Sequence, residues 1–263
     1  MKRVLALALV ACLLVLGLTA CGNTDKSDLA YVKNKGKIIV GITDFAPMDY
    51  EKTEGSGDWI GFDADMAKEF AKYLGVEVEF LEINWGTKAT TLETKGIDVV
   101  WNGMTITDEV KGLMGVSEAY CKNAQVVVMK QDAVANYTTT DSLKALTFAV
   151  EDGSAGAKAL DALGITNYTA CDDQAKALME VAAGSSQACV IDLLMAGAMI
   201  GEGTSYPTLT TGLELTSEEY GVGFRKESDL IAEFNKFWKQ AYDAGTVMEV
   251  ATTYGIAQNI IEK

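Results

Sequence analysis

Compact apolar runs alternate with amphipathic stretches in the first half of the chain. Residues 37–42 (KIIVGI) form an apolar run typical of a buried parallel strand. Residues 66–74 have helical spacing, follow two aspartates and end before Gly75, as expected of a helix. A strand over 76–83, a helix from 84 to about 96 and a strand over 97–101 follow. This order predicts a parallel α/β unit.

The same alternation returns after an extended segment at 124–130. We predict strands at 146–151, near Tyr168 and at 188–191, and helices at 155–163, 174–184 and 193–200. A last strand over 220–224 and two amphipathic helices, 230–244 and 247–254, close the chain. Two α/β blocks in tandem predict two lobes.

The N-terminus carries a secretion signal. Lys2 and Arg3 precede an apolar run over 4–18 that is short for a membrane span. The sequence LTAC at 18–21 resembles the lipobox of bacterial lipoproteins, so residues 1–20 would be removed and Cys21 would carry the lipid. The alternative is an ordinary signal peptide with an incidental cysteine. With a lipid on Cys21, residues 21–34 would tether a water-facing body to the extracytoplasmic face of the cell membrane.

Composition excludes several classes of protein. Lys2 and Arg3 are the only charged residues of the signal, so 20 basic and 37 acidic residues remain, a net charge of −17. This balance argues against nucleic-acid binding. The chain has no histidine, which removes the commonest general base, and its five cysteines have no metal-ligand spacing. We therefore expect no metal site and no cofactor.

Small polar residues follow the strand at 97–101. Asn102-Gly103 ends it, and Met104-Thr105-Ile106-Thr107 leads into a charged turn and a short helix. Free backbone groups and two hydroxyls at the carboxyl end of a strand suit a small polar ligand. The alternative is an ordinary strand, turn and helix with a capping threonine.

Five short motifs resemble, in order and spacing, the extracellular solute-binding proteins of amino-acid ABC importers. They are GFDADM at 61–66, NGMTITDE at 102–109, the turn at 150–156, ACVID at 188–192 and YGVGF at 220–224. The resemblance covers about residues 35–260 and follows a lipobox, as in the lipoprotein form of this family.

The resemblance implies a type II periplasmic-binding-protein fold, with a ligand cleft between two lobes. Lobe 1 would comprise 35–119 and 222–263, lobe 2 would comprise 125–217, and hinges would lie near 120–124 and 217–221. The expected function is capture of a polar amino acid or related amine by cleft closure, and delivery to a membrane permease by a monomer. Alternatives on the same fold are a cyclohexadienyl dehydratase-like enzyme and a sensory module.

Site residues follow from the resemblance position by position. Phe45 and Trp85 would flank the ligand, although either ring could be plain core. Asp192 would accept hydrogen bonds from the ligand ammonium group, with helix capping as its alternative role. The backbone of Gly103, next to Met104, would also accept from the ammonium.

The ligand carboxylate would be bound at the start of the helix at 155–163. Free N–H groups at Ala155 and the Ser154 hydroxyl suit an anion there, and a simple capped turn is the alternative. The Thr105 hydroxyl would hold the other side of this carboxylate.

One position departs from the family pattern. The family has a carboxylate-clamping arginine where this chain has Val110. Lys111 is one residue along, about 100° around a helix, so it is a poor substitute. Lys88 is the candidate replacement, and Glu151 lies where the family often admits cations. Either another group binds the carboxylate, or the ligand is a cationic amine.

Overall fold

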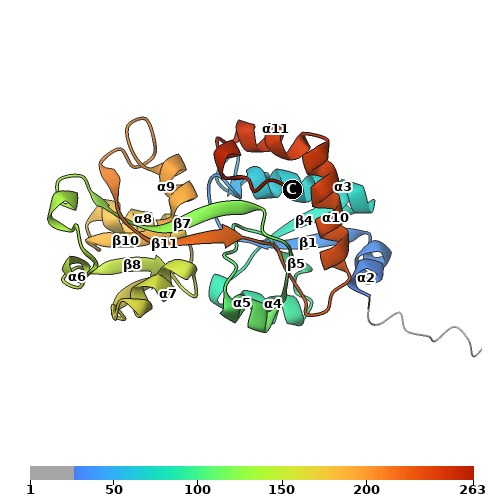
Figure 1. The fold of residues 1–263 in the computed structure, drawn as a ribbon, viewed down its shortest axis with the longest axis horizontal. Coiled ribbons are helices and arrows are strands. Elements are labelled where there is room, and N and C mark those ends of the chain that lie inside the picture. Colours follow the sequence, from blue (N-terminus) through green and yellow to red (C-terminus); the bar gives the residue numbers. More distant parts are fainter. Residues whose placement is uncertain (1–26) are drawn as a thin grey trace, which may run out of the picture.

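Two α/β lobes lie side by side in the computed structural model, which describes residues 27–263 (Figure 1). The predicted two-lobed α/β fold is confirmed. The predicted signal at 1–20 and the predicted lipid-attachment position, Cys21, lie outside the described residues. Among the residues described, none of the helices is both long and apolar enough to cross a membrane.

The sheet of lobe 1 has the strand order β4-β1-β5-β12-β6. Its strands are β1 (Lys37–Ile42), β4 (Glu77–Glu82), β5 (Val99–Val100), β6 (Gly115–Val116) and β12 (Gly223–Phe224). Helices α3 (Phe62–Leu74), α10 (Leu230–Asp243) and α11 (Thr246–Thr253) lie on one side, and α4 (Lys88–Glu93) and α5 (Asp108–Leu113) on the other (Figure 1). β1 pairs in parallel with β4 and β5, as the apolar runs predicted.

The sheet of lobe 2 has the order β11-β7-β10-β8-β9. Its strands are β7 (Cys121–Lys130), β8 (Phe148–Glu151), β9 (Tyr168–Cys171), β10 (Ala188–Asp192) and β11 (Leu209–Tyr220). Its helices are α6 (Thr140–Leu143), α7 (Ala155–Ala162), α8 (Gln174–Ala183) and α9 (Leu193–Met199). The structure also has a small hairpin, β2 (Tyr50–Glu51) with β3 (Trp59–Ile60). Three short 3₁₀ helices span Trp85–Thr87, Val134–Asn136 and Ala257–Asn259.

The chain passes between the lobes on a pair of strands. β7 begins at Cys121, β11 ends at Tyr220, and these two residues are antiparallel partners. The Tyr120 N–H donates to the Tyr220 carbonyl over 2.9 Å. The predicted hinge ranges, 120–124 and 217–221, fall on this paired crossover, and rotation about it remains a prediction.

Two elements differ from the predicted pattern. β11 is a twelve-residue strand where we predicted a strand only over 220–224. Its pairing with β7 is shifted between Thr211 and Glu214 and again between Glu214 and Thr216, which breaks the alternation that identifies a strand in a sequence. α3 begins four residues before the predicted start, directly after Gly61, whose φ of 125° favours glycine.

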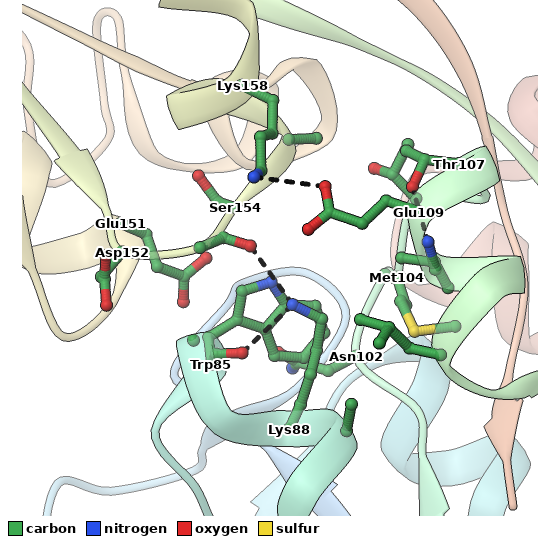
Figure 2. Close-up of a pocket in the computed structure, with 18 of the residues that line it drawn as sticks. Trp85, Lys88, Asn102, Met104, Thr107, Glu109, Glu151, Asp152, Ser154 and Lys158 are labelled. Atoms are coloured by element: carbon green, nitrogen blue, oxygen red, sulfur yellow. Dashed lines mark hydrogen bonds and ion pairs between the residues drawn. The ribbon is translucent and has the colours of Figure 1, made fainter. Parts of the chain in front are cut away.

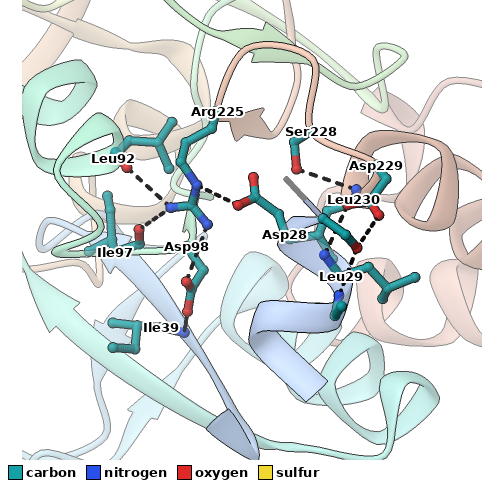
Figure 3. Close-up of polar contacts among 12 residues, drawn as sticks. Asp28, Leu29, Ile39, Leu92, Ile97, Asp98, Arg225, Ser228, Asp229 and Leu230 are labelled. Carbon is teal, nitrogen blue, oxygen red and sulfur yellow. Dashed lines mark hydrogen bonds and ion pairs between the residues drawn. The ribbon is translucent and has the colours of Figure 1, made fainter. Parts of the chain in front are cut away.

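The predicted tether is too long. Residues 28–34 of the predicted tether lie within α2 (Asp28–Lys35), which packs on lobe 1. The Asp229 carboxylate accepts from the Leu29 N–H over 2.9 Å, and Asp28 pairs with Arg225 over 2.8 Å (Figure 3). Polar composition suggested a free segment, but an ion pair and a hydrogen bond with residues about 200 positions away hold this helix.

Arg225 joins three parts of lobe 1 (Figure 3). Its guanidinium contacts Asp28, the fully buried Asp98 at 3.4 Å, and the carbonyls of Leu92 and Ile97 at 3.1 and 2.8 Å. Asp98 also pairs with Lys35. Because Asp98 has no exposure to solvent, its charge depends on these partners.

Replacing Arg225 with methionine should lower the free energy of unfolding by about 3 kcal/mol, since one partner of a buried ion pair is lost. Urea unfolding of the wild-type and variant proteins measures this loss. Lys226→Met is the matched control, because Lys226 is the exposed neighbour. Equal losses in the two variants would contradict a special role for Arg225.

Candidate functional site

A cavity of about 260 Å³ lies between the two lobes (Figure 2). Lobe 1 contributes Trp85, Gly86, Lys88 and Ala89, together with side chains from the segment 102–114. Lobe 2 contributes the turn from β8 into α7, Lys158, Gln174 and Asp192. Asn102, Glu151 and Asp192 each lie at the carboxyl end of a strand, which is where open α/β sheets bind ligands.

Asp192 forms the acidic end of the cavity. It is the last residue of β10 and is 4 % exposed. Its carboxylate accepts from Gln125 Nε2 at 2.9 Å and from the Tyr220 hydroxyl at 2.6 Å, and also from the amides of Asn123 and Gln174. Neutral donors satisfy this carboxylate, and none of them neutralises its charge.

The capping alternative for Asp192 is wrong. α9 begins at Leu193, but none of its N–H groups donates to the Asp192 side chain. Asp192 lines the cavity, and its carboxylate accepts from side chains of β7, α8 and β11 instead.

Burial controls the ionisation of two acids in this cavity. Burial raises the pKa of Asp192 to about 8, and the nearby Glu218 carboxylate adds to the effect. Burial likewise raises the pKa of Glu151 to about 8, with Asp192 adding to the shift and Lys88 opposing it. A cationic ligand group beside Asp192 would favour its ionised form.

The other end of the cavity is the start of α7. Ser154 accepts from the Ala157 N–H at 3.1 Å, so the predicted cap is present, and Ala155 follows in the cavity lining. Lys88 reaches this end from lobe 1, where its Nζ donates to the carbonyl of Gly153 at 3.2 Å and to that of Trp85 at 3.1 Å (Figure 2). Burial lowers the pKa of Lys88 to about 8, opposed chiefly by Glu151.

The wall beside α5 is apolar. Val110 lines the cavity together with Leu113, Met114 and Met104. Lys111 is exposed and is not among the lining residues, which agrees with the helical geometry expected from the sequence. Thr107 caps α5 through the Val110 N–H, as the simpler alternative for this segment predicted.

Of the two aromatic candidates, Trp85 lines the cavity and Phe45 does not. The ring of Trp85 has Lys88 Nζ 4.5 Å from its centroid. Phe45 is 2 % exposed and packs edge-on against Tyr220. It also lies under Gly103, where a Cβ would come within 2.4 Å of its ring. Here Phe45 supports the cavity wall, and contact with a ligand remains a prediction.

Thr105 is engaged differently from the expectation. Its hydroxyl donates to Glu218 Oε1 at 2.9 Å, so its hydrogen is not directed to a ligand carboxylate. The oxygen can still accept, which suits the ammonium end better. Gly103 and Met104 line the cavity as expected of ligand neighbours, and the Gly103 N–H donates to the buried Asp63 at 2.7 Å.

The lobes touch across the cavity. A Cβ on Gly153 would lie 2.7 Å from Gly86 Cα, the Thr43 hydroxyl donates to Glu151 at 3.2 Å, and Lys158 pairs with Glu109 at 3.2 Å (Figure 2). The Lys158–Glu109 pair was not predicted, because no sequence pattern joins these positions.

Asn123, Gln125 and Glu218 were also missed. Asn123 and Gln125 are polar residues at alternate positions in β7, whose other buried residues are apolar, so their side chains share one face. This alternation was the available signal for a polar network. Glu218 had none, since β11 was not recognised as a strand there.

Residues 38–257 match the family model of bacterial extracellular solute-binding proteins, family 3. The chain is 28 % identical to the arginine-binding extracellular protein ArtP of Bacillus subtilis, over 93 % of this chain and 94 % of that protein. It is 27 % identical to the B. subtilis ABC transporter glutamine-binding protein GlnH, over 95 % and 96 %. A mutant of ArgBP from T. maritima has a similar structure, with a TM-score of 0.79 at 30 % identity, covering 86 % of this chain and 98 % of that one. The chain therefore belongs to the bacterial extracellular solute-binding proteins, family 3.

Proposed function

We propose that this protein is the substrate-binding subunit of an ABC importer, which captures a polar amino acid or a related small amine by cleft closure and delivers it to the permease. The observation that carries the proposal is the buried Asp192 carboxylate, which lines a cavity built from both lobes and has no ion pair with a lysine or arginine among residues 27–263. The cavity is below the roughly 300–1,000 Å³ typical of drug-sized ligands, so a small molecule fits it.

Two ends of the cavity match the two ends of an amino acid. The ammonium would lie at Asp192, near the Thr105 oxygen and the Gly103 backbone. The carboxylate would lie at Ser154 and Ala155, with Lys88 as the cation in place of an arginine at position 110. Trp85 and Met104 would contact the rest of the ligand. The relatives' names, which specify arginine and glutamine, support this ligand class.

The binding role is non-enzymatic. The matched family and the relatives compared above are named for solute binding, which supports this assignment over a dehydratase. A sensory module would keep the same site, and a permease encoded beside the gene would argue for transport.

The position at the membrane rests on the sequence. We propose that Cys21 carries a lipid and anchors a monomer to the extracytoplasmic face of the membrane. Metabolic labelling with a palmitate analogue should mark the wild-type protein and not Cys21→Ser. Labelling of both would contradict a lipid at Cys21.

A thermal-shift panel tests the ligand class. The chain from Gly22, which contains every described element, would be unfolded and refolded to remove carried-over ligand. Standard amino acids would be paired with their decarboxylated amines. Stabilisation by an amino acid and not by its amine would support the carboxylate site. The reverse result would support a cationic amine ligand, and no shift from either class would contradict the proposed function.

A further inference from the structure

Glu218 lies beside the ammonium end of the cavity. It stands on β11, two residues before the crossover at Tyr220. Gln125 Nε2 donates both to Glu218 Oε1 at 2.7 Å and to Asp192 Oδ1 at 2.9 Å. Asn123 Nδ2 bridges the same two oxygens and is 2.7 Å from Glu218. Two shared donors place the carboxylates within the roughly 4–6 Å at which like charges oppose each other's ionisation.

The groups around this pair are acidic or neutral. From β11, Tyr220 and Glu218 face Asp192; from β8, Glu151 faces it; from β7 and α8 come the amides of Asn123, Gln125 and Gln174. Lys88, which also lines the cavity, is a cation that acts on Glu151. Among residues 27–263, no lysine or arginine forms an ion pair with Asp192 or Glu218.

Glu218 also links this pair to lobe 1. Its Oε1 accepts from the Thr105 hydroxyl, and its Oε2 accepts from Thr216 at 3.3 Å. The first contact fixes the direction of the hydroxyl hydrogen in the cavity wall. The Thr105 oxygen is then left to accept from a ligand.

We propose that Glu218 is a positioning residue of the ammonium site: its carboxylate favours the protonated form of Asp192 in the ligand-free protein, so that binding of an ammonium group releases the Asp192 proton to solvent. The inference rests on the proposed function, because it assigns the ammonium to Asp192. The ammonium keeps its own hydrogens, and the Asp192 carboxylate is ionised in the complex. The positive charge of the ligand replaces that of the proton.

Calorimetric titration with L-arginine and with L-glutamine at pH 7, in phosphate and in Tris, measures the protons released. We expect the wild-type enthalpy to depend on the buffer, with close to one proton released per ligand bound. The Glu218→Gln variant should still bind the ligand but should release less than half as many protons as the wild-type protein. Glu219→Gln, the exposed neighbour on β11, is the matched control and should behave as wild type. Glu151→Gln tests whether the proton comes from that acid instead.

A buffer-independent enthalpy for the wild-type protein would overturn the proposal. Equal release by wild type and Glu218→Gln would overturn it too, as would loss of release in Glu151→Gln alone. Failure of every amino acid and amine to bind would instead count against the proposed function.

A measurement without ligand tests the same pair. The raised pKa of Asp192 means that the folded protein keeps a proton that the unfolded chain loses between about pH 4 and pH 8. This contribution to stability is full at the acid end of that range and is lost as the pH rises through it. The free energy of unfolding in urea should therefore fall less from pH 5 to pH 8 in Glu218→Gln than in wild type or Glu219→Gln. Equal declines in all three proteins would overturn the proposal.

Discussion

Replacing Asp192 with asparagine should weaken the binding of L-arginine or L-glutamine about 10- to 150-fold. An ammonium bound to a carboxylate gains charge-assisted hydrogen bonds worth about 1.5–3 kcal/mol, which corresponds to that range. Asparagine keeps the shape of the side chain but has no negative charge. Calorimetric titration of each variant with the amino acid that stabilises the wild-type protein measures the loss.

A local rearrangement could mimic this result, because the new amide would meet donors from Asn123, Gln125 and Gln174. Circular dichroism and urea unfolding of the ligand-free variant would show whether the fold persists. Asp172→Asn is the matched control, since Asp172 is an exposed acid of lobe 2 with 78 % of its side chain accessible. Full affinity in Asp192→Asn would remove Asp192 from the ammonium site.

The fold was largely predictable because most of its elements carry a local signal. The apolar run at 37–42 is β1 to the residue, and Gly75 ends α3 in the left-handed conformation, as helix stops commonly do. The two misjudged regions have non-local causes. α2 is held by Arg225 and Asp229, which contact Asp28 and Leu29 from far away in the sequence. β11 pairs with β7 in an irregular register.

Residues of the site were predictable only where they line the cavity at the end of a strand or at the start of a helix. Asp192 follows an apolar strand, and Ser154 precedes a helix, so both could be found by position. The network behind Asp192 depends on sheet order. Gln125 is the register partner of Asp192 on one side and of Thr216 on the other, a relation that only the assembled sheet creates. The burial of Phe45 likewise depends on how close Gly103 comes to its ring.

Replacing Lys88 with methionine should separate amino acids from their decarboxylated amines. If Lys88 binds the ligand carboxylate, Lys88→Met should weaken L-arginine binding about 10- to 150-fold, since one charge-assisted contact is lost. Agmatine, which is arginine without its carboxylate, should lose less than about threefold, or 0.7 kcal/mol. Methionine preserves most of the apolar stem of the side chain. Titration of both ligands against both proteins gives the comparison.

Two further variants identify the cation. Lys111→Met is the control, because this exposed residue lies next to Val110 and outside the cavity lining. Lys158→Met tests the other lysine of the cavity, which is paired with Glu109. If Lys158→Met is the one variant that weakens L-arginine binding more than agmatine binding, the ligand carboxylate is bound by Lys158 of lobe 2 and not by Lys88.

The pH dependence gives an independent check on Lys88. Its pKa of about 8 means that the charge is largely present at pH 7 and is lost as the pH rises past 8. L-arginine affinity should therefore fall above pH 8 in the wild-type protein more steeply than in Lys88→Met. If Lys88→Met leaves L-arginine binding unchanged, Lys88 is not the carboxylate partner. If wild type binds agmatine more tightly than L-arginine, the apolar wall at Val110 marks a site for amines.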